Sequence, residues 1–169
     1  MSSNLTGPTI FFSYIITSIQ QAIMKKTFTV GWLGTGVMGE PMAGHLLDAG
    51  HSLIVHTRTR SKADSLIAQG AEWANSPSEA AERSDFVFTM LGYPQDVERI
   101  YCAEDGVFAG CRTNSVLIDM TTSNPDLAKR IAGKALERDA QALDAPVSGG
   151  DVGAKSGKLA IMCGGEKSA

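Results

Sequence analysis

The stretch Gly31-Trp-Leu-Gly34-Thr-Gly36-Val-Met-Gly39 follows an alternating segment rich in β-forming residues and precedes a segment with apolar residues at helical spacing. A strand that turns sharply into a helix needs a corner residue that tolerates backbone angles forbidden to side chains, and Gly34 meets that need. Gly36 lets the backbone approach a bound group, and Gly39 lets the helix pack closely on the strand. The spacing therefore predicts a helix N-terminus that binds a diphosphate. The residues expected around that group are Gly34, Thr35, Gly36, Val37, Met38 and Gly39.

The end of the next expected strand, 52–56, indicates which nucleotide fits this turn. An NAD site usually has Asp or Glu there to accept hydrogen bonds from the ribose hydroxyls. This chain has Thr57, Arg58 and Thr59 instead. A guanidinium holds a 2′-phosphate through charge-assisted hydrogen bonds, and the threonine hydroxyls are suitable donors. The sequence therefore predicts NADP in preference to NAD. The alternative is that Arg58 and Arg60 are both solvated loop residues.

Strand-like and helix-like segments alternate along most of the chain. Strands are expected at 27–33, 52–56, 71–73, 85–91, 115–119 and 141–144, and helices at 37–49, 62–69, 94–101 and 123–139, with another helix that starts at Ser76-Pro77. This alternation predicts an α/β fold with a Rossmann-type doubly wound parallel sheet. Ligands of such sheets lie beyond the carboxyl ends of the strands, so the nicotinamide half of a dinucleotide is expected beside Met90, Leu91, Gly92 and Thr122. The alternative for each of these residues is an ordinary strand-to-helix turn.

Composition narrows the classes of function. A chain of 169 residues with 43% hydrophobic residues can bury one good core, so one domain is expected. The net charge of −3 gives no bulk attraction to nucleic acid or to an anionic membrane, and neither partner is expected. Cys102, Cys111 and Cys163 are scattered without a metal-binding spacing. They indicate reduced thiols, a cytoplasmic protein and no metal site.

The first residues differ in character from the rest. Residues 1–24 are expected to be an N-terminal extension outside the fold, and residues 25–169 an NAD(P)-binding domain. The apolar run 10–16 is too short and too interrupted to span a bilayer, and it lacks the basic region and cleavage site of a signal peptide. A weak membrane-surface anchor is the alternative for this segment.

A second glycine-rich stretch, 144–165, follows the last of these strands. Consecutive glycines expose N–H groups that can bind a carboxylate, and the Ser148 hydroxyl can donate to a substrate oxygen. Ser148, Gly149 and Gly150 are therefore the candidate substrate-binding residues. No GxSxG elbow surrounds Ser148, so a nucleophile is not expected there. The alternative is a purely structural hairpin loop.

Together the two glycine-rich stretches resemble signatures of the β-hydroxyacid dehydrogenase family, which includes 3-hydroxyisobutyrate dehydrogenase, tartronate semialdehyde reductase and, more distantly, 6-phosphogluconate dehydrogenase. Residues 34–47 are similar to the N-terminal signature of that family and residues 144–150 to its substrate-loop signature. Thr57-Arg58-Thr59 is similar to the Asn-Arg-Thr of members that use NADP, and Thr122 matches a threonine on the nicotinamide side. Gly92 stands where many members have proline.

The resemblance implies hydride transfer between NADP(H) and a small 3-hydroxy acid or semialdehyde. It implies that the Ser148–Gly150 loop holds the substrate carboxylate and that a lysine transfers the proton. In the family that lysine, and the helical C-terminal domain that forms an oligomer, come later than the position of Ala169. We therefore expect this chain to bind NADP(H) but to have little turnover by itself, with a homo-oligomeric full-length form.

Two other classes of function are open at this level. A non-catalytic nucleotide-binding or regulatory module would share the first half of the chain. An imine reductase would share the coenzyme domain, but it usually differs in the Ser-Gly-Gly loop, which disfavours that class.

Overall fold

The computed structural model describes residues 27–167 and 169. The expectation for residues 1–24 therefore lies outside the described residues. Within the described part of the chain, no helix is both long enough and apolar enough to cross a membrane.

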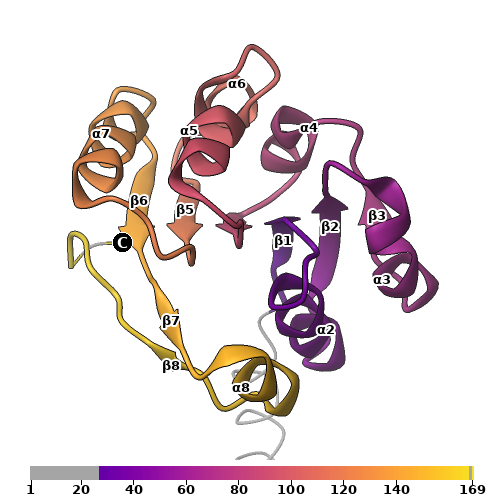
Figure 1. Cartoon of the computed structure of the whole chain (residues 1–169). Helices are drawn as coiled ribbons and strands as arrows, with labels where there is room; N and C mark the ends of the chain where they lie inside the picture. The colour runs from indigo at the N-terminus through magenta and orange to yellow at the C-terminus, as the bar shows by residue number, and fades with distance from the viewer. Residues whose placement is uncertain (1–26, 168) are drawn as a thin grey trace, which may run out of the picture.

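A six-stranded parallel sheet forms the middle layer of the molecule (Figure 1). Its strands are β1 (Thr29–Leu33), β2 (Ser52–His56), β3 (Glu72–Trp73), β4 (Phe86–Thr89), β5 (Val116–Asp119) and β6 (Gln141–Asp144), in the spatial order β3-β2-β1-β4-β5-β6. The chain moves outward from β1 through β2 and β3, then returns to the other side of β1 with β4. The strand order therefore reverses between β1 and β4, which opens a crevice at their carboxyl ends. This topology confirms the predicted doubly wound Rossmann-type fold.

Helices cover both faces of the sheet (Figure 1). One face carries α2 (Gly39–Asp48), the 3-10 turn η1 (Arg60–Ala63), α3 (Asp64–Ala68) and, further along the chain, α8 (Gly150–Ser156). The other face carries α4 (Pro77–Glu82), α5 (Pro94–Cys102), α6 (Val107–Gly110) and α7 (Pro125–Leu136). Short α6 is missing from the elements that the sequence predicts, because four residues are too few for a helical period to appear.

The core consists of two apolar clusters, one on each side of the sheet. Successive side chains of a strand point to opposite faces, so Trp32 enters the cluster beneath α2 while Leu33 enters the cluster beneath α4 to α7. Both side chains are almost fully buried. A sheet covered on both faces explains why the strands are apolar nearly throughout.

The caps of two helices fix the loops at the carboxyl edge of the sheet. Ser76 begins α4 as expected, because its Oγ accepts a hydrogen bond from the amide of Glu79 at 3.1 Å. The sequence places the start of this helix at 123, but α7 begins two residues later, at Pro125. The N-cap is Asn124, whose Oδ1 accepts from the amide of Asp126 at 2.8 Å. Pro125 explains this shift, since a proline is best accommodated at the first helical position.

The stretch after β6 differs most from the sequence expectation. The sequence predicts a glycine-rich loop here, but the chain forms β7 (Val147–Ser148), the helix α8, and β8 (Ala160–Ile161). Strands β7 and β8 pair in antiparallel register, and an isolated bridge joins Asp144 to Gly164. Burial of Ala154 against the α2 side of the core explains how a glycine-rich segment holds a helix.

Candidate functional site

The turn after β1 is closed on its inner side. Gly34 has a φ of +103°, and a Cβ there would overlap the carbonyl oxygen of Met90. A Cβ at Gly39 would overlap the carbonyl oxygen of Gly34, so the first turn of α2 packs directly on the corner. The indole Nε1 of Trp32 donates to that same Gly34 oxygen at 2.9 Å. These contacts leave no room for side chains at the two positions.

The outer side of the same turn is open. A Cβ built on Gly36 would meet no protein atom within 4 Å. Neighbouring Thr35 is 2% exposed, and its Oγ1 has no hydrogen-bond partner among the described residues. Burying a hydroxyl without a partner costs free energy, which a bound oxygen-rich group would relieve. The turn therefore fits a diphosphate that approaches the backbone at Gly36.

A cavity of about 190 Å³ opens from this turn at the carboxyl edge of β1, β2 and β4. Three segments predicted to bind a coenzyme meet along its walls: residues 34–36, residues 57–59 and residues 90–92. The cavity is also lined by residues that the sequence analysis did not single out, namely His56, Lys62, Asp96, Arg99 and Ile100.

Other residues predicted for the coenzyme site lie outside the lining of this cavity. The sequence predicts a helix from 37 onward, but Val37 precedes α2 and its side chain is 71% exposed. Met38 packs against the α2 cluster, Gly39 lies beneath the turn, and Thr122 is exposed at the same edge of the sheet. Ser148, Gly149 and Gly150 lie at the junction of β7 and α8.

The cavity wall carries an excess of positive charge. Arg58, Lys62 and Arg99 line it, and all three are exposed. None of them forms an ion pair with another residue of the described segment 27–167. Asp96 is the single carboxylate of the lining. Cations without partners beside an open cavity favour an anionic ligand.

A second cavity, of about 400 Å³, adjoins the first. His56, Thr57, Arg58, Arg99 and Ile100 line both. The second cavity adds Trp73, over whose ring the guanidinium of Arg60 lies at 5.4 Å. This stacking gives Arg60 a local partner, whereas no ion pair or ring contact of Arg58 is found among the described residues.

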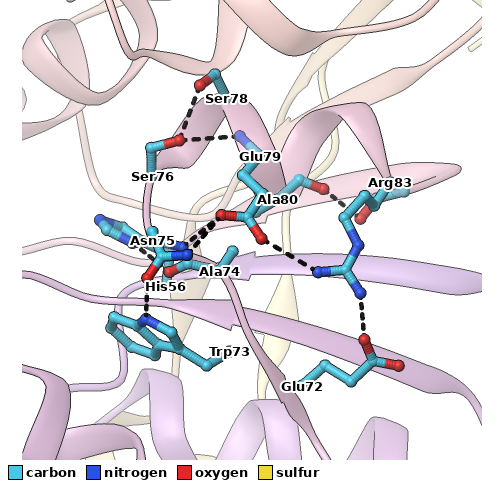
Figure 2. A network of polar contacts seen from close by, with 11 residues as sticks. His56, Glu72, Trp73, Ala74, Asn75, Ser76, Ser78, Glu79, Ala80 and Arg83 are labelled. Atoms are coloured by element: carbon cyan, nitrogen blue, oxygen red, sulfur yellow. Dashed lines mark hydrogen bonds and ion pairs between the residues drawn. The ribbon is translucent and has the colours of Figure 1, made fainter.

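Figure 2 shows the polar network around Trp73 and Asn75, two residues that line the second cavity. The indole Nε1 of Trp73 donates to Oδ1 of Asn75 at 3.2 Å. The backbone N and Nδ2 of Asn75 both donate to Oε2 of Glu79, at 2.9 and 3.0 Å. Arg83 bridges Glu79 and Glu72. The hydrogen bonds from Asn75, with a smaller contribution from Arg83, lower the pKa of Glu79 below its ordinary value. The loop between β3 and α4 is therefore held from several directions.

A buried carboxylate organises the other end of the crevice. Oδ1 of Asp119 accepts from the Thr89 hydroxyl at 2.7 Å and from the Thr121 amide at 3.1 Å. The Thr121 hydroxyl accepts in turn from the amide of Leu91 at 3.0 Å. Burial raises the pKa of Asp119, although these hydrogen bonds oppose the shift. The chain of contacts ties the loop after β4 to the loop after β5, and it leaves Thr122 exposed. The Oγ of Ser123 is buried without a hydrogen-bond partner among the described residues.

The glycine pair after β7 adopts backbone conformations that favour glycine. Gly149 has a φ of +134° and Gly150 a φ of +61°, and both are exposed together with Ser148. These angles explain why two glycines stand where the chain turns from β7 into α8.

The fold and the first cavity define a dinucleotide-binding domain. Residues 29–169 match the family described as the NAD binding domain of 6-phosphogluconate dehydrogenase, and the chain belongs to that family. The coenzyme indicated by this membership is a nicotinamide dinucleotide.

Curated relatives are named as oxidoreductases. The chain is 51% identical over 146 residues to the oxidoreductase YkwC of Bacillus subtilis, covering 86% of this chain and 50% of YkwC. It is also 51% identical over 146 residues to the probable 3-hydroxyisobutyrate dehydrogenase-like 1 of Arabidopsis thaliana, covering 86% of this chain and 44% of that protein. It shares 40% identity over 140 residues with the NAD-dependent L-serine dehydrogenase of Pseudomonas aeruginosa, covering 83% of this chain and 47% of that protein. The chain thus spans about half the length of the curated relatives it matches.

Solved structures give the same family. The 3-hydroxyisobutyrate dehydrogenase of Mycobacterium tuberculosis, solved with L-serine, superposes with a TM-score of 0.78 at 35% identity, covering 84% of this chain and 48% of that one. Psf3, solved with NADP+ and 2-OPP, superposes with a TM-score of 0.78 at 30% identity, covering 82% and 49%. These findings confirm the expected relationship to the 3-hydroxyisobutyrate dehydrogenases.

Proposed function

We propose that this chain binds NADP(H) in preference to NAD(H). The observation that carries this proposal is the cationic wall at the tip of β2, where Arg58 and Lys62 line the cavity without an ion-pair partner in the described segment. No carboxylate follows β2 before Asp64 to accept hydrogen bonds from an unphosphorylated ribose. A 2′-phosphate would place negative charge opposite Arg58 and Lys62.

The proposal extends to the reaction of the whole protein. The domain belongs to an oxidoreductase that transfers hydride between NADP(H) and a small 3-hydroxy acid or semialdehyde, as its relationship to 3-hydroxyisobutyrate dehydrogenases supports. The bound nicotinamide supplies or accepts the hydride. The exposed Ser148–Gly150 loop binds the substrate carboxylate through its hydroxyl and amides. The proposal includes little turnover by this chain alone, because the resemblance implies a proton-transferring lysine outside the two stretches that it matches, 34–47 and 144–150.

The L-serine dehydrogenase of Pseudomonas aeruginosa is named as NAD-dependent, whereas Psf3 was solved with NADP+. A direct binding measurement therefore decides between the two coenzymes for this chain. Calorimetric titration of the full chain with NADPH and with NADH makes that test. NADPH should bind more tightly, and Arg58→Ala should lower its affinity by about tenfold to a hundredfold, the range expected for hydrogen bonds to a charged group. The affinity for NADH should change by less than about twofold.

Arg130→Ala is the matched control for the loss of one positive charge. Arg130 pairs with Glu98 at 2.7 Å and does not line the cavity, so its loss should leave both affinities nearly unchanged. Equal losses for NADPH and NADH in Arg58→Ala would overturn the preference for NADP. An absence of heat with either coenzyme would overturn coenzyme binding itself.

A further inference from the structure

The candidate substrate loop leads into a small unit, made of β7, α8 and β8, that backbone hydrogen bonds join to the end of β6 and that packs on the sheet through α8. The loop, 148–150, leads directly into α8, which packs on the α2 side of the sheet. Ala154 of α8 is fully buried in the same apolar cluster as Met42 and Ala43 of α2. Apolar packing of this kind brings the two helices together, and a hydrogen bond between them adds a directional restraint.

One side chain adds a directional contact between these helices. Nε2 of His45, in the last turn of α2, lies 2.8 Å from the carbonyl oxygen of Ala154. The distance requires that Nε2 carries the proton and donates, because a carbonyl oxygen only accepts. Two polar side-chain contacts that begin in α8, from Ser156 to the Val152 carbonyl and from Lys155 to Asp151, stay inside the helix.

The imidazole also lies against the end of α8. Gly157 caps the helix in the left-handed conformation, with a φ of +65°. A Cβ on Gly157 would lie 3.5 Å from Nε2 of His45, so the ring and the cap are in close proximity. The Ala154 oxygen also accepts from the amide of Gly157 at 3.3 Å. His45 therefore contacts α8 at the turn where orphan carbonyls collect and where a donor is most favourable.

We propose that His45 is a positioning residue that fixes α8, and with it the Ser148–Gly150 loop, to the helix that begins at the dinucleotide turn. Because α2 starts at Gly39 and carries His45 on its last turn, one rigid element sets both the diphosphate turn and the carboxylate loop. The ligand expected to bind the Ser148–Gly150 loop is a small carboxylate. Only the identity of this ligand rests on the proposed function.

Amide hydrogen exchange on the full chain tests the positioning role without any ligand. His45→Leu removes the donor, whereas His45→Gln keeps an N–H donor at the same number of bonds from Cβ. In His45→Leu the amides of residues 149–157 should exchange about three to ten times faster, the change expected for one net hydrogen bond. Amides of β1 and β4 should keep their protection. His45→Gln should restore most of the protection in α8.

Ser156→Ala is the control for a general weakening of α8. It removes the bond from Ser156 to Val152 inside the helix but leaves the contact with α2. Ser156→Ala should accelerate exchange in α8 less than His45→Leu does. Adding His45→Gln to the Ser156→Ala variant should not restore the protection that Ser156→Ala removes. Equal exchange in His45→Leu and the wild type, or equal acceleration in the Leu and Gln variants, would overturn the positioning role.

A second measurement separates this inference from the proposed function. With NADP+ present, 3-hydroxyisobutyrate should shift the amide resonances of Ser148, Gly149 and Gly150, and His45→Leu should weaken that binding about threefold or more while NADP+ affinity is unchanged. If the wild type shows no such shifts but the exchange results hold, the carboxylate assignment fails and the positioning role stands. If the shifts appear but are the same in His45→Leu, the positioning role fails.

Discussion

The Thr89 hydroxyl donates to Oδ1 of Asp119 across 2.7 Å, and this bond joins the last residue of β4 to the last residue of β5. Both side chains are buried. Because the same carboxylate oxygen holds the amide of Thr121, and Thr121 holds the amide of Leu91, one acid sets the shape of the crevice beside the coenzyme cavity. The geometry thus supports a structural role for Asp119.

The contribution of Asp119 to the stability of the folded protein should depend on pH, and burial sets the direction of that dependence. Burial raises its pKa, so the folded protein binds that proton more tightly than the unfolded chain does. The contribution of this group to stability is therefore present at pH values below its unfolded pKa and is lost as pH rises through the folded pKa. Asp119→Asn, which stays neutral, should gain thermal stability relative to the wild type over a pH range that begins near the ordinary pKa of an aspartate, about 3.9, and extends upward. A difference that is constant over that range, or equal to that of exposed Asp105→Asn, would contradict this assignment.

Asp119→Ala should behave differently from Asp119→Asn. Removal of the acceptor leaves the Thr89 hydroxyl and the Thr121 amide buried without their present partner. An unsatisfied buried donor costs about 1–3 kcal/mol, so the alanine variant should lose that amount in a denaturant titration.

Alanine substitutions at two glycines of the dinucleotide turn should affect thermal stability and coenzyme affinity differently. A Cβ at Gly36 meets nothing within 4 Å, so Gly36→Ala should fold with a Tm close to that of the wild type. The added methyl group would nevertheless occupy the space where the diphosphate approaches, and affinity for NADPH and NADH should fall together by about tenfold or more. Unchanged affinity in a folded Gly36→Ala protein would place the diphosphate elsewhere.

Gly34→Ala is the opposite case. Its φ of +103° and the overlap of a Cβ with Met90 both strain the backbone. Strain at such a position costs about 1–3 kcal/mol, and the overlap adds to it. A thermal unfolding scan should show a clear loss of Tm without any ligand present.

Lys62 should assist Arg58 in selecting the coenzyme. It lies in η1 and lines the first cavity, where its ammonium group would act as a point charge toward a 2′-phosphate. Lys62→Gln should weaken NADPH binding by about threefold to tenfold and leave NADH binding unchanged, and added salt should shrink that difference. Lys129→Gln, at a lysine that pairs with Asp126 outside this cavity, provides the control in the same titration.

The network around Glu79 should make the loop between β3 and α4 sensitive to acid. Hydrogen bonds from Asn75 lower the pKa of Glu79 in the folded protein. Their contribution to stability is therefore present above the unfolded pKa, near 4.5, and is lost as pH falls through the folded pKa. Glu79→Gln should destabilise the protein at pH 6 by an amount that shrinks toward about pH 3. Glu82→Gln, on the exposed side of the same helix, should show no such trend in thermal unfolding.

The sequence was most informative where local chemistry decides the structure. The alternation of β-formers into Trp32 and Leu33 indicated a strand, and the glycine spacing after it indicated the turn, because steric overlap at Gly34 and Gly39 allows no side chain. Ser76 could be recognised as a cap for the same reason, since its bond to Glu79 is formed within one helical turn.

Features that depend on tertiary contact could not be predicted in the same way. Gly150 and Gly153 hide α8 from sequence analysis, because glycine disfavours a helix and the contacts that compensate, such as the packing of Ala154 against α2, are tertiary. Arg99 reaches the cavity from α5, which is far from Arg58 in the sequence, so no local pattern marks it. Lys62 could have been predicted as a second cation of the site, because it follows Arg58 by four residues, about one helical turn. The NADP preference, the carboxylate loop, the cytoplasmic location and the homo-oligomer stay predictions.

The hydrogen bond from Trp32 to the Gly34 carbonyl has a practical consequence. The chain has two tryptophans, and Trp32 is 2% exposed beneath the corner that a diphosphate would approach. We therefore expect the emission of its indole to change when a ligand occupies that corner. In a Trp73→Phe background, quenching of this emission would follow occupancy of the turn without any label.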